Sequence, residues 1–339
     1  MMKGNCKFSL SSLSLLVVLG MFCLPSQAQG PAKRLSRFGR RIEGQAAGLV
    51  PVVPRPRPAL GQSGLNFTFG LIDFPRSPDT MATGLNSRGD IVGLYGPNLP
   101  AYEGTEQSYV LEGNTFQELI YPGATYTGGL GINKSRKIVG WYTSPGDNVH
   151  AFLRTGKTYT NIDYPGSDNT LPIAINDSGV VIGMHYENSE SATHGFFLKK
   201  GVYTSIDPPN STYTEPLGIN SAGVIVGDYE DQNFVNHGFI YQKGQFTTVD
   251  YPGASNTDLT GINDQGQMVG GYGDDVIVGA EDWPTPNPFF FDGTTFTPIQ
   301  LPVDDAQVSW TAAFNGQQFV GLYVDSLGDI YGYQATIGH

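Results

Sequence analysis

The sequence predicts an all-β protein, a six-bladed β-propeller made of four-stranded antiparallel blades. One observation is a pattern of the type Gly-Ile-Asn-x-x-Gly-x-x-Val-Gly that occurs six times, its asparagines 43 to 52 residues apart. These asparagines are Asn86, Asn133, Asn176, Asn220, Asn263 and Asn315. A second observation is that every repeat holds short apolar runs of strand length rather than helix length. A third is that one repeat is split between the two ends of the repeat region, which favours a closed ring over an open solenoid.

Residues 1–28 have the features of a secretory signal peptide. Two lysines near the start precede an apolar stretch from Leu13 to Leu24, and a small-residue cleavage site ends at Ala28. The apolar stretch is too short to span a membrane, which takes about 20 residues. Both cysteines of the chain lie in this segment, so the mature chain has none. We therefore expect an exported protein without disulfides, secreted, periplasmic or at the cell surface, with no membrane insertion after signal cleavage.

Residues 29–62 predict a disordered basic linker. They contain seven lysines and arginines and a single acid, Glu43, and four prolines between residues 51 and 58 favour a stiff, extended chain. Such low-complexity tracts do not bury a core. An alternative is an electrostatic arm that contacts an acidic surface, and the rest of the chain is the most acidic surface available.

The propeller region, residues 63–339, carries a formal charge of about −20. A nucleic-acid-binding surface needs clustered basic residues, so this balance argues against a nucleic-acid partner. It favours solubility, bound cations or cationic partners. We expect a monomeric protein.

One repeat, residues 217–250, shows the expected strands. Its four apolar or aromatic runs are Leu217–Ile219, Val224–Tyr229, His237–Tyr241 and Gln245–Val249. Asn220-Ser-Ala-Gly223 predicts the first turn, because Asn starts such turns and Gly accepts a left-handed backbone. Gln242-Lys-Gly244 predicts a tight hairpin between the last two runs. Four antiparallel strands in a repeat of this length form a propeller blade.

The ends of the repeat region predict how the ring closes. The last repeat stops after Ile330–Thr336, which aligns with a third strand, and its fourth strand is absent. Residues Phe67–Asp73 match the fourth strands of other repeats, such as Phe246–Asp250. We therefore expect the N-terminal strand to complete the last blade and leave no exposed sheet edge.

The loops after the second and fourth strands of each blade share one face, because successive strands alternate in direction. That face, the variable-loop face, holds the long segments 96–107, 143–149, 187–193, 230–236 and 273–288, together with the links between blades. Variable loops on a rigid scaffold commonly carry function, so we expect any binding site on this face.

Acidic and aromatic residues of these loops are the candidate ligand-binding residues. They are Tyr229, Glu230, Asp231, Asp274, Asp275 and Trp283. An exposed aromatic ring beside carboxylates suits stacking on a sugar; the alternative is a solvated acidic rim with Trp283 packed on a neighbouring blade. Loop carboxylates also suit calcium, with Asp228, Asp231, Asp274 and Asp275 as candidates, although their spacing matches no helix-loop-helix site. No other cofactor is expected.

Several repeated residues are interpreted as structural. Asp73, Asp163, Asp207 and Asp250 precede the links between blades, and His150, His194 and His237 open third strands. Since each type recurs at equivalent places in several blades, we expect turn and strand hydrogen bonds rather than one catalytic or metal site. The tyrosines two residues beyond the terminal glycines are expected to pack between neighbouring sheets. No nucleophile elbow, phosphate-binding loop or zinc-protease motif is present.

The phrases His150-Ala-Phe152, His194-Gly-Phe196 and Ile162-Asp-Tyr-Pro-Gly166 resemble those of the bacterial extracellular HAF-repeat proteins. The resemblance covers about residues 67–336 and implies an exported, β-propeller-like protein. It implies no activity and no catalytic residue. The first, second, fifth and sixth repeats depart from the pattern, for example with Gln107-Ser-Tyr109 in place of His-Gly-Phe.

The function that these features favour is an exported binding or scaffold module that recognises a glycan or a protein partner, rather than an enzyme. A hydrolase or lyase acting on polysaccharide is the second hypothesis. It requires two carboxylates near the mouth of the central channel on the variable-loop face. A structural repeat protein of the cell surface is the third.

Overall fold

The computed structural model describes residues 50–51, 65–97, 99, 107–144, 148–187, 192–273, 277–278, 281–282, 287–304, 306 and 308–338. All regular secondary structure in these segments is β-strand. None of the described residues belongs to a helix that could cross a membrane.

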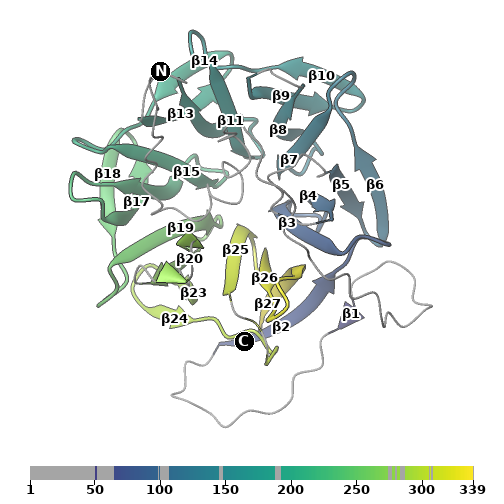
Figure 1. Cartoon of the computed structure of the whole chain (residues 1–339). Coiled ribbons are helices and arrows are strands. Elements are labelled where there is room, and N and C mark those ends of the chain that lie inside the picture. Colours follow the sequence, from purple (N-terminus) through teal and green to yellow (C-terminus); the bar gives the residue numbers. More distant parts are fainter. Residues whose placement is uncertain are drawn as a thin grey trace, which may run out of the picture.

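The strands form four-stranded antiparallel groups, the blades, arranged around a central axis (Figure 1). Two groups are β3 (Asp79–Leu85), β4 (Ile91–Gly96), β5 (Gln107–Glu112) and β6 (Thr115–Leu119), then β7 (Tyr126–Ile132), β8 (Ile138–Thr143), β9 (His150–Thr155) and β10 (Thr158–Asn161). Two more are β11 (Asn169–Ile175), β12 (Val181–Tyr186), β13 (Thr193–Lys199) and β14 (Val202–Ser205), then β15 (Tyr213–Ile219), β16 (Ile225–Glu230), β17 (Asn236–Gln242) and β18 (Gln245–Val249). The next is β19 (Asn256–Ile262), β20 (Met268–Gly273), β23 (Asn287–Phe291) and β24 (Phe296–Pro298), with the short pair β21 (Ile277–Val278) and β22 (Glu281–Asp282) between β20 and β23.

The predicted all-β propeller class is confirmed by this arrangement. The first strand of each blade lies nearest the axis (Figure 1), and neighbouring first strands contact one another. The apolar core fills the space between blades: Val92 and Val110 of one blade pack with Ile138 and Phe152 of the next. A single parallel pair, Thr193 with Tyr213, joins two neighbouring blades into one eight-stranded sheet, and the blade number of six stays a prediction from the repeats.

Ring closure follows the predicted route. The last blade contains β25 (Val308–Asn315), β26 (Gln318–Val324), β27 (Ile330–Gly338) and the N-terminal strand β2 (Asn66–Ile72). β2 pairs antiparallel with β27 from Asn66 opposite Gly338 to Ile72 opposite Gly332. A two-residue strand β1 (Val50–Pro51), within the segment expected to be linker, pairs with β2. The expected signal peptide and the rest of the linker lie outside the described residues.

The glycine that ends each repeat is required by a close approach of strands. In the blade that begins at β15, a Cβ added to Gly227 would collide with the carbonyl oxygen of Glu215 and lie 2.9 Å from the ring of Phe239. The first strand shifts its register beside this point, between Pro216 and Gly218. The same collision with a first-strand carbonyl occurs at Gly93, Gly140, Gly183, Gly270 and Gly321.

The repeated asparagine has a role beyond the predicted turn. The side-chain oxygen of Asn176 accepts the N–H groups of Ser178 (3.1 Å) and Val180 (2.9 Å), and its amide donates to the carbonyl of Asn220 in the next blade (3.0 Å). The amides of Asn86, Asn133, Asn220 and Asn263 bridge to the following blade in the same way. A chain of buried asparagines thus ties neighbouring blades together close to the axis.

Three of the repeated aspartates, Asp163, Asp207 and Asp250, pair with the third-strand histidines, as the structural interpretation expects. The Nδ1 atoms of His150, His194 and His237 lie 2.8, 3.2 and 3.1 Å from a carboxylate oxygen of Asp163, Asp207 and Asp250. Asp163 also accepts the N–H of Ala151 at 2.6 Å. The repeated tyrosines stack where blades meet, as Tyr142 does on Tyr121 with ring centroids 3.6 Å apart.

Candidate functional site

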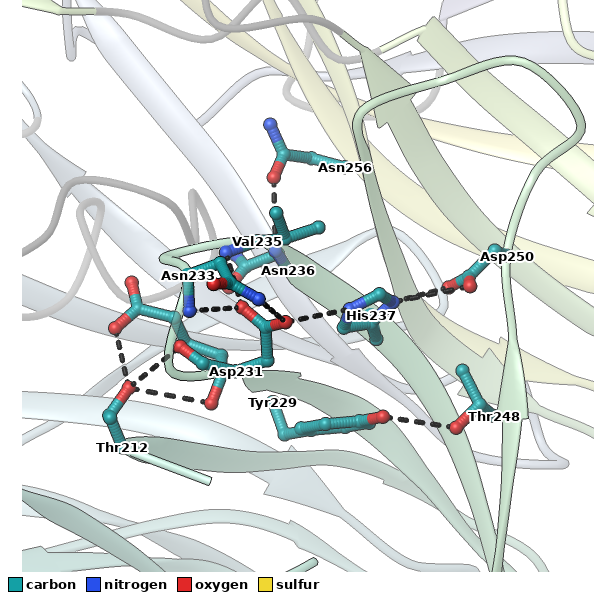
Figure 2. Close-up of polar contacts among 11 residues, drawn as sticks. Thr212, Tyr229, Asp231, Asn233, Val235, Asn236, His237, Thr248, Asp250 and Asn256 are labelled. Atoms are coloured by element: carbon teal, nitrogen blue, oxygen red, sulfur yellow. Dashed lines mark hydrogen bonds and ion pairs between the residues drawn. The ribbon is translucent and has the colours of Figure 1, made fainter. Parts of the chain in front are cut away.

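The loop between β16 and β17, residues 231–235, lies within one of the predicted variable segments and is called here the Phe234 loop. Asp231 organises it: its Oδ1 accepts the N–H groups of Asn233 (2.8 Å) and Val235 (3.0 Å), and its Oδ2 accepts the Asn233 amide (3.0 Å) (Figure 2). The hydrogen bond from Val235 and those from Asn233 hold the pKa of Asp231 below its usual value. The predicted ligand residue Asp231 therefore shapes the loop from within.

Phe234 stands in a left-handed backbone conformation, with φ of 63°, while its side chain is 64% exposed. The loop is a copy of the turn that follows the first strands, because the Phe234 N–H donates to the Asp231 carbonyl and the Asp231 N–H to the Val235 carbonyl. The corresponding position in other copies of this turn is glycine: Gly89, Gly179, Gly223, Gly266 and Gly328, with φ between 80° and 83°. A bulky residue costs about 1 kcal/mol or more in this conformation, which glycine adopts freely.

Arg136 is the other residue that replaces this glycine, with φ of 58°. Its guanidinium lies 2.8 Å from Asp90 and 2.9 Å from Glu112, so it ties two blades together by ion pairs. Arg136 thus gains contacts within the protein that offset its backbone strain. Phe234, by contrast, is exposed and makes no aromatic ring contact with the other described residues.

Tyr229 and Glu230, also predicted to bind a ligand, support the Phe234 loop. The Tyr229 hydroxyl lies 3.0 Å from the Thr248 hydroxyl, and Glu230 is buried and accepts the Thr212 hydroxyl at 2.7 Å (Figure 2). His237 connects the loop to the blade, with Nε2 3.9 Å from Asp231 and Nδ1 3.1 Å from Asp250. Both predicted residues are therefore held in contacts within the blade.

A group of buried carboxyls lies beneath the Phe234 loop at the junction with the next blade. This carboxyl cluster consists of Glu215 on β15, Asp228 and Glu230 on β16, and Asp258 on β19. Glu215 pairs across the sheet with Asp228, and Asp258 holds the equivalent first-strand position in the next blade. At the same register the other blades carry Met81 with Leu94, Gly128 with Trp141, Leu171 with Met184, and Trp310 with Leu322.

Burial raises the pKa of two carboxyls of this cluster, Asp258 and Asp228. It raises the pKa of Asp258 to about 7. Burial, followed by the nearby carboxyls of Asp258 and Glu215, raises the pKa of Asp228 well above its usual value. Asp228 is 0% exposed, and within the described part of the chain its carboxyl has no hydrogen-bond partner apart from its own backbone.

Of the four aspartates proposed as calcium ligands, Asp228 and Asp231 are among the described residues, and their carboxyls have different surroundings. Asp228 is buried between blades, whereas the Asp231 carboxylate faces the N–H groups of its own loop. Among the described residues no group of three or more His, Cys, Asp or Glu side chains is arranged to hold a metal. Asp274 and Asp275, like the candidate aromatic residue Trp283, lie outside the described residues.

Sequence reasoning missed three residues of this region: Phe234, Glu215 and Asp258. A finer alignment of the repeats contains the signal for each of them. Residues 231–235 follow the turn pattern of residues 86–90 with phenylalanine in the glycine position, and the two acids fall where other repeats carry apolar residues or glycine.

No protein-family model matches the chain, and no curated protein matches its sequence. A prolyl endopeptidase structure aligns with a TM-score of 0.50 at 9% identity, over 86% of this chain and 50% of that chain. The β-propeller domain of the Trilobed protease from Pyrococcus furiosus has a TM-score of 0.48 at 13% identity, over 85% and 95%. A fucose-recognising lectin from Aleuria aurantia, a six-bladed β-propeller, has a TM-score of 0.45 at 11% identity, over 76% and 93%. At these identities the likeness concerns the fold, not the ligand or activity.

Proposed function

We propose that this chain is an exported β-propeller binding module that holds a glycan on its variable-loop face, with Phe234 as the central contact. The observation that carries the proposal is an exposed phenylalanine in a turn position that five other copies of the turn give to glycine. Backbone strain of this kind persists where function selects it, and ligand-binding loops are a common place for it.

The composition of the loop supports a glycan. Gln232 and Asn233 are exposed beside Phe234 and offer amide donors and acceptors next to an aromatic ring. A sugar presents an apolar ring face flanked by hydroxyl groups, which such a combination matches. The fixed geometry from Asp231 reduces the entropy lost when a ligand binds. A protein partner is the other outcome that a binding screen can return.

A polysaccharide hydrolase or lyase is the second candidate, and the carboxyl cluster is the observation in its favour. Asp228 and Asp258 have the raised pKa values that general acids use. Asp228, however, is completely buried, so its carboxyl cannot touch a substrate in this conformation. Release of new reducing ends from a bound polysaccharide, abolished in Asp258→Asn, would favour this candidate over simple binding.

Export and domain organisation are part of the same proposal. Residues 1–28 act as the signal, residues 29–62 as the basic linker and residues 63–339 as the propeller, in keeping with the resemblance to extracellular HAF-repeat proteins. The mass of the exported protein should correspond to a chain that begins at Gln29.

Replacing Phe234 with glycine tests the binding proposal. The variant should lose binding about tenfold or more, because the central aromatic contact is removed. Its melting temperature should stay equal or rise slightly, because glycine relieves the left-handed strain. A screen of soluble glycans and exported proteins identifies the ligand, and calorimetry then measures the affinity.

Leu327→Ala is the matched control for this experiment. Leu327 is an exposed apolar residue in the equivalent loop of the last blade, and its removal should leave binding unchanged. A Phe234→Gly variant that binds as tightly as the natural protein would contradict the proposed site.

A further inference from the structure

The carboxyl cluster has no role in a binding contact made by Phe234, yet it replaces apolar side chains that would stabilise the fold. The Asp228 carboxyl is costly to ionise, because it is fully buried and has no hydrogen-bond partner among the described residues apart from its own backbone. Four apolar side chains fill the equivalent second-strand position in other blades: Leu94, Trp141, Met184 and Leu322. The acidic substitutions are confined to two neighbouring blades, so repeat packing does not require them.

Within the described part of the chain, the charged groups that act on Asp228 are three other carboxyls: Asp258 on β19, Glu215 on β15 and Glu230 on β16. The strands on the outer side add no charge at the paired positions, which are Gly238 on β17 and Gly271 on β20. Glu215 and Glu230 accept hydroxyl hydrogen bonds from Tyr213 (3.1 Å) and Thr212 (2.7 Å). The raised pKa values of Asp228 and Asp258 mean that protons can neutralise both carboxyls.

We propose that the carboxyl cluster is a proton-dependent latch between two blades, closed when Asp228 and Asp258 are protonated and loosened when both ionise. Repulsion between like charges would then separate β16 from β19 at the end that carries the Phe234 loop. The latch is a property of the fold, and its effect on ligand affinity rests on the proposed binding function.

The connection from latch to loop is short. Asp228 lies three residues before Asp231 on the same chain segment, and Glu230 between them is held by Thr212 at the start of the blade. A shift of the β16 end therefore moves the aspartate that shapes the Phe234 loop. Ligand binding should weaken as the latch opens.

The direction of the pH effect follows from the raised pKa values. An unfolded aspartate ionises near pH 3.8, whereas Asp258 in the folded chain ionises at about pH 7. Between these values the folded state holds more protons than the unfolded state, so the cluster's contribution to stability falls as pH rises. The loss begins near pH 4 and is complete for Asp258 once the pH passes about 7.

Asp228→Leu tests the latch, because leucine is the residue at the equivalent positions 94 and 322. The natural protein and the variant are melted from pH 4 to pH 9. At pH 8 the melting temperature of the variant should be higher than that of the natural protein by roughly 5 °C or more. Between pH 5 and pH 8 the melting temperature of the natural protein should fall, and that of the variant should fall much less. In the natural protein, hydrogen exchange of the β16 and β19 amides should increase with pH by more than the intrinsic exchange rate does. In the variant it should increase only as the intrinsic rate does.

Two further variants keep the test decisive. Asp258→Asn should reproduce the reduced pH dependence if Asp228→Leu does not fold. Asp264→Asn, an exposed residue on the opposite face whose bond to Ser221 an asparagine can retain, should leave the pH profile unchanged. The latch proposal is contradicted if the melting temperatures of both cluster variants fall with pH as steeply as that of the natural protein. It is also contradicted if Asp228→Leu is less stable than the natural protein at pH 8.

Ligand affinity measured at pH 5.5 and pH 8 separates the two proposals. Tighter binding in acid that becomes pH-independent in Asp228→Leu supports the link to function. Binding that is equal at both pH values refutes that link. If no glycan or protein binds at any pH, the binding proposal fails, while the melting and exchange results still decide whether the latch exists.

Discussion

At the scale of single residues, the most repeated positions serve the backbone. The terminal glycine makes room for a carbonyl and an aromatic ring. The histidine of three third strands pairs with the aspartate that follows the fourth strand. Functional candidates are the residues that break this pattern. Phe234 occupies a glycine position, and Asp228 an apolar one, with no gain in stability visible for either.

Gly227→Ala should lower the free energy of unfolding by about 3 kcal/mol, because its Cβ would force the Glu215 carbonyl and the Phe239 ring apart. Gly223→Ala is the comparison: open space surrounds that position, and only its positive φ opposes a side chain, at a cost of about 1 kcal/mol. Urea denaturation measures both. Equal losses would show that close packing at Gly227 is not what excludes a side chain.

At the scale of elements, one turn type is used in two places. After first strands it is headed by asparagine, whose amide also reaches the next blade. In the loops 231–235 and 325–329 it is headed by aspartate, whose Oδ1 accepts N–H groups of the loop. A carboxylate has no N–H to donate to the next blade. The chemical difference between amide and carboxylate thus separates turns that join blades from turns that present a loop.

Asn176→Ala should destabilise the protein by about 2 to 3 kcal/mol, since it removes two bonds within the turn and one between blades. Ser178→Ala in the same turn should change stability by less than about 0.5 kcal/mol, because only the Ser178 N–H takes part in the Asn176 bonds. Chemical denaturation of the two variants makes the comparison. Equal denaturant midpoints for the two variants would indicate that the asparagine hydrogen bonds between blades do not contribute to stability.

At the scale of the whole molecule, closure depends on a strand contributed from the start of the chain. β2 covers the edge of β27 and brings Phe69 and Ile72 into the core. Without it, β27 would expose a row of unpaired backbone groups, which invites association with other chains.

A chain that begins at Leu65 should have a melting temperature close to that of the full chain, because it keeps all of β2. A chain that begins at Phe74 should melt lower by roughly 10 °C or more, or associate, because it loses β2 and its buried side chains. Calorimetry and light scattering after gel filtration report the two effects. A stable monomer that begins at Phe74 would mean that the ring holds without its closing strand.

Much of the fold could be predicted because it depends on local chemistry. Asparagine and glycine at a fixed spacing specify a turn, alternating short runs specify strands, and the displaced fourth strand shows where the ring closes. Part of the site was predicted for a similar reason: Tyr229, Glu230 and Asp231 stand out as an acidic segment next to an aromatic residue. Their roles as supports could not be foreseen, because hydrogen bonds to Thr248 and Thr212 depend on packing.

The sequence by itself determined the repeat and the strand order within a blade, since both are written in residues close together along the chain. It also identified the closing strand, because residues 67–73 match the fourth strands of other repeats. Only the tertiary structure decided that Asp258 lies beside Asp228, that Phe234 is exposed in a left-handed turn, and that five of the repeated asparagines reach the next blade. Those facts depend on the register between strands and the contact between blades. Both bring together residues that are about one repeat apart, where no local pattern links them.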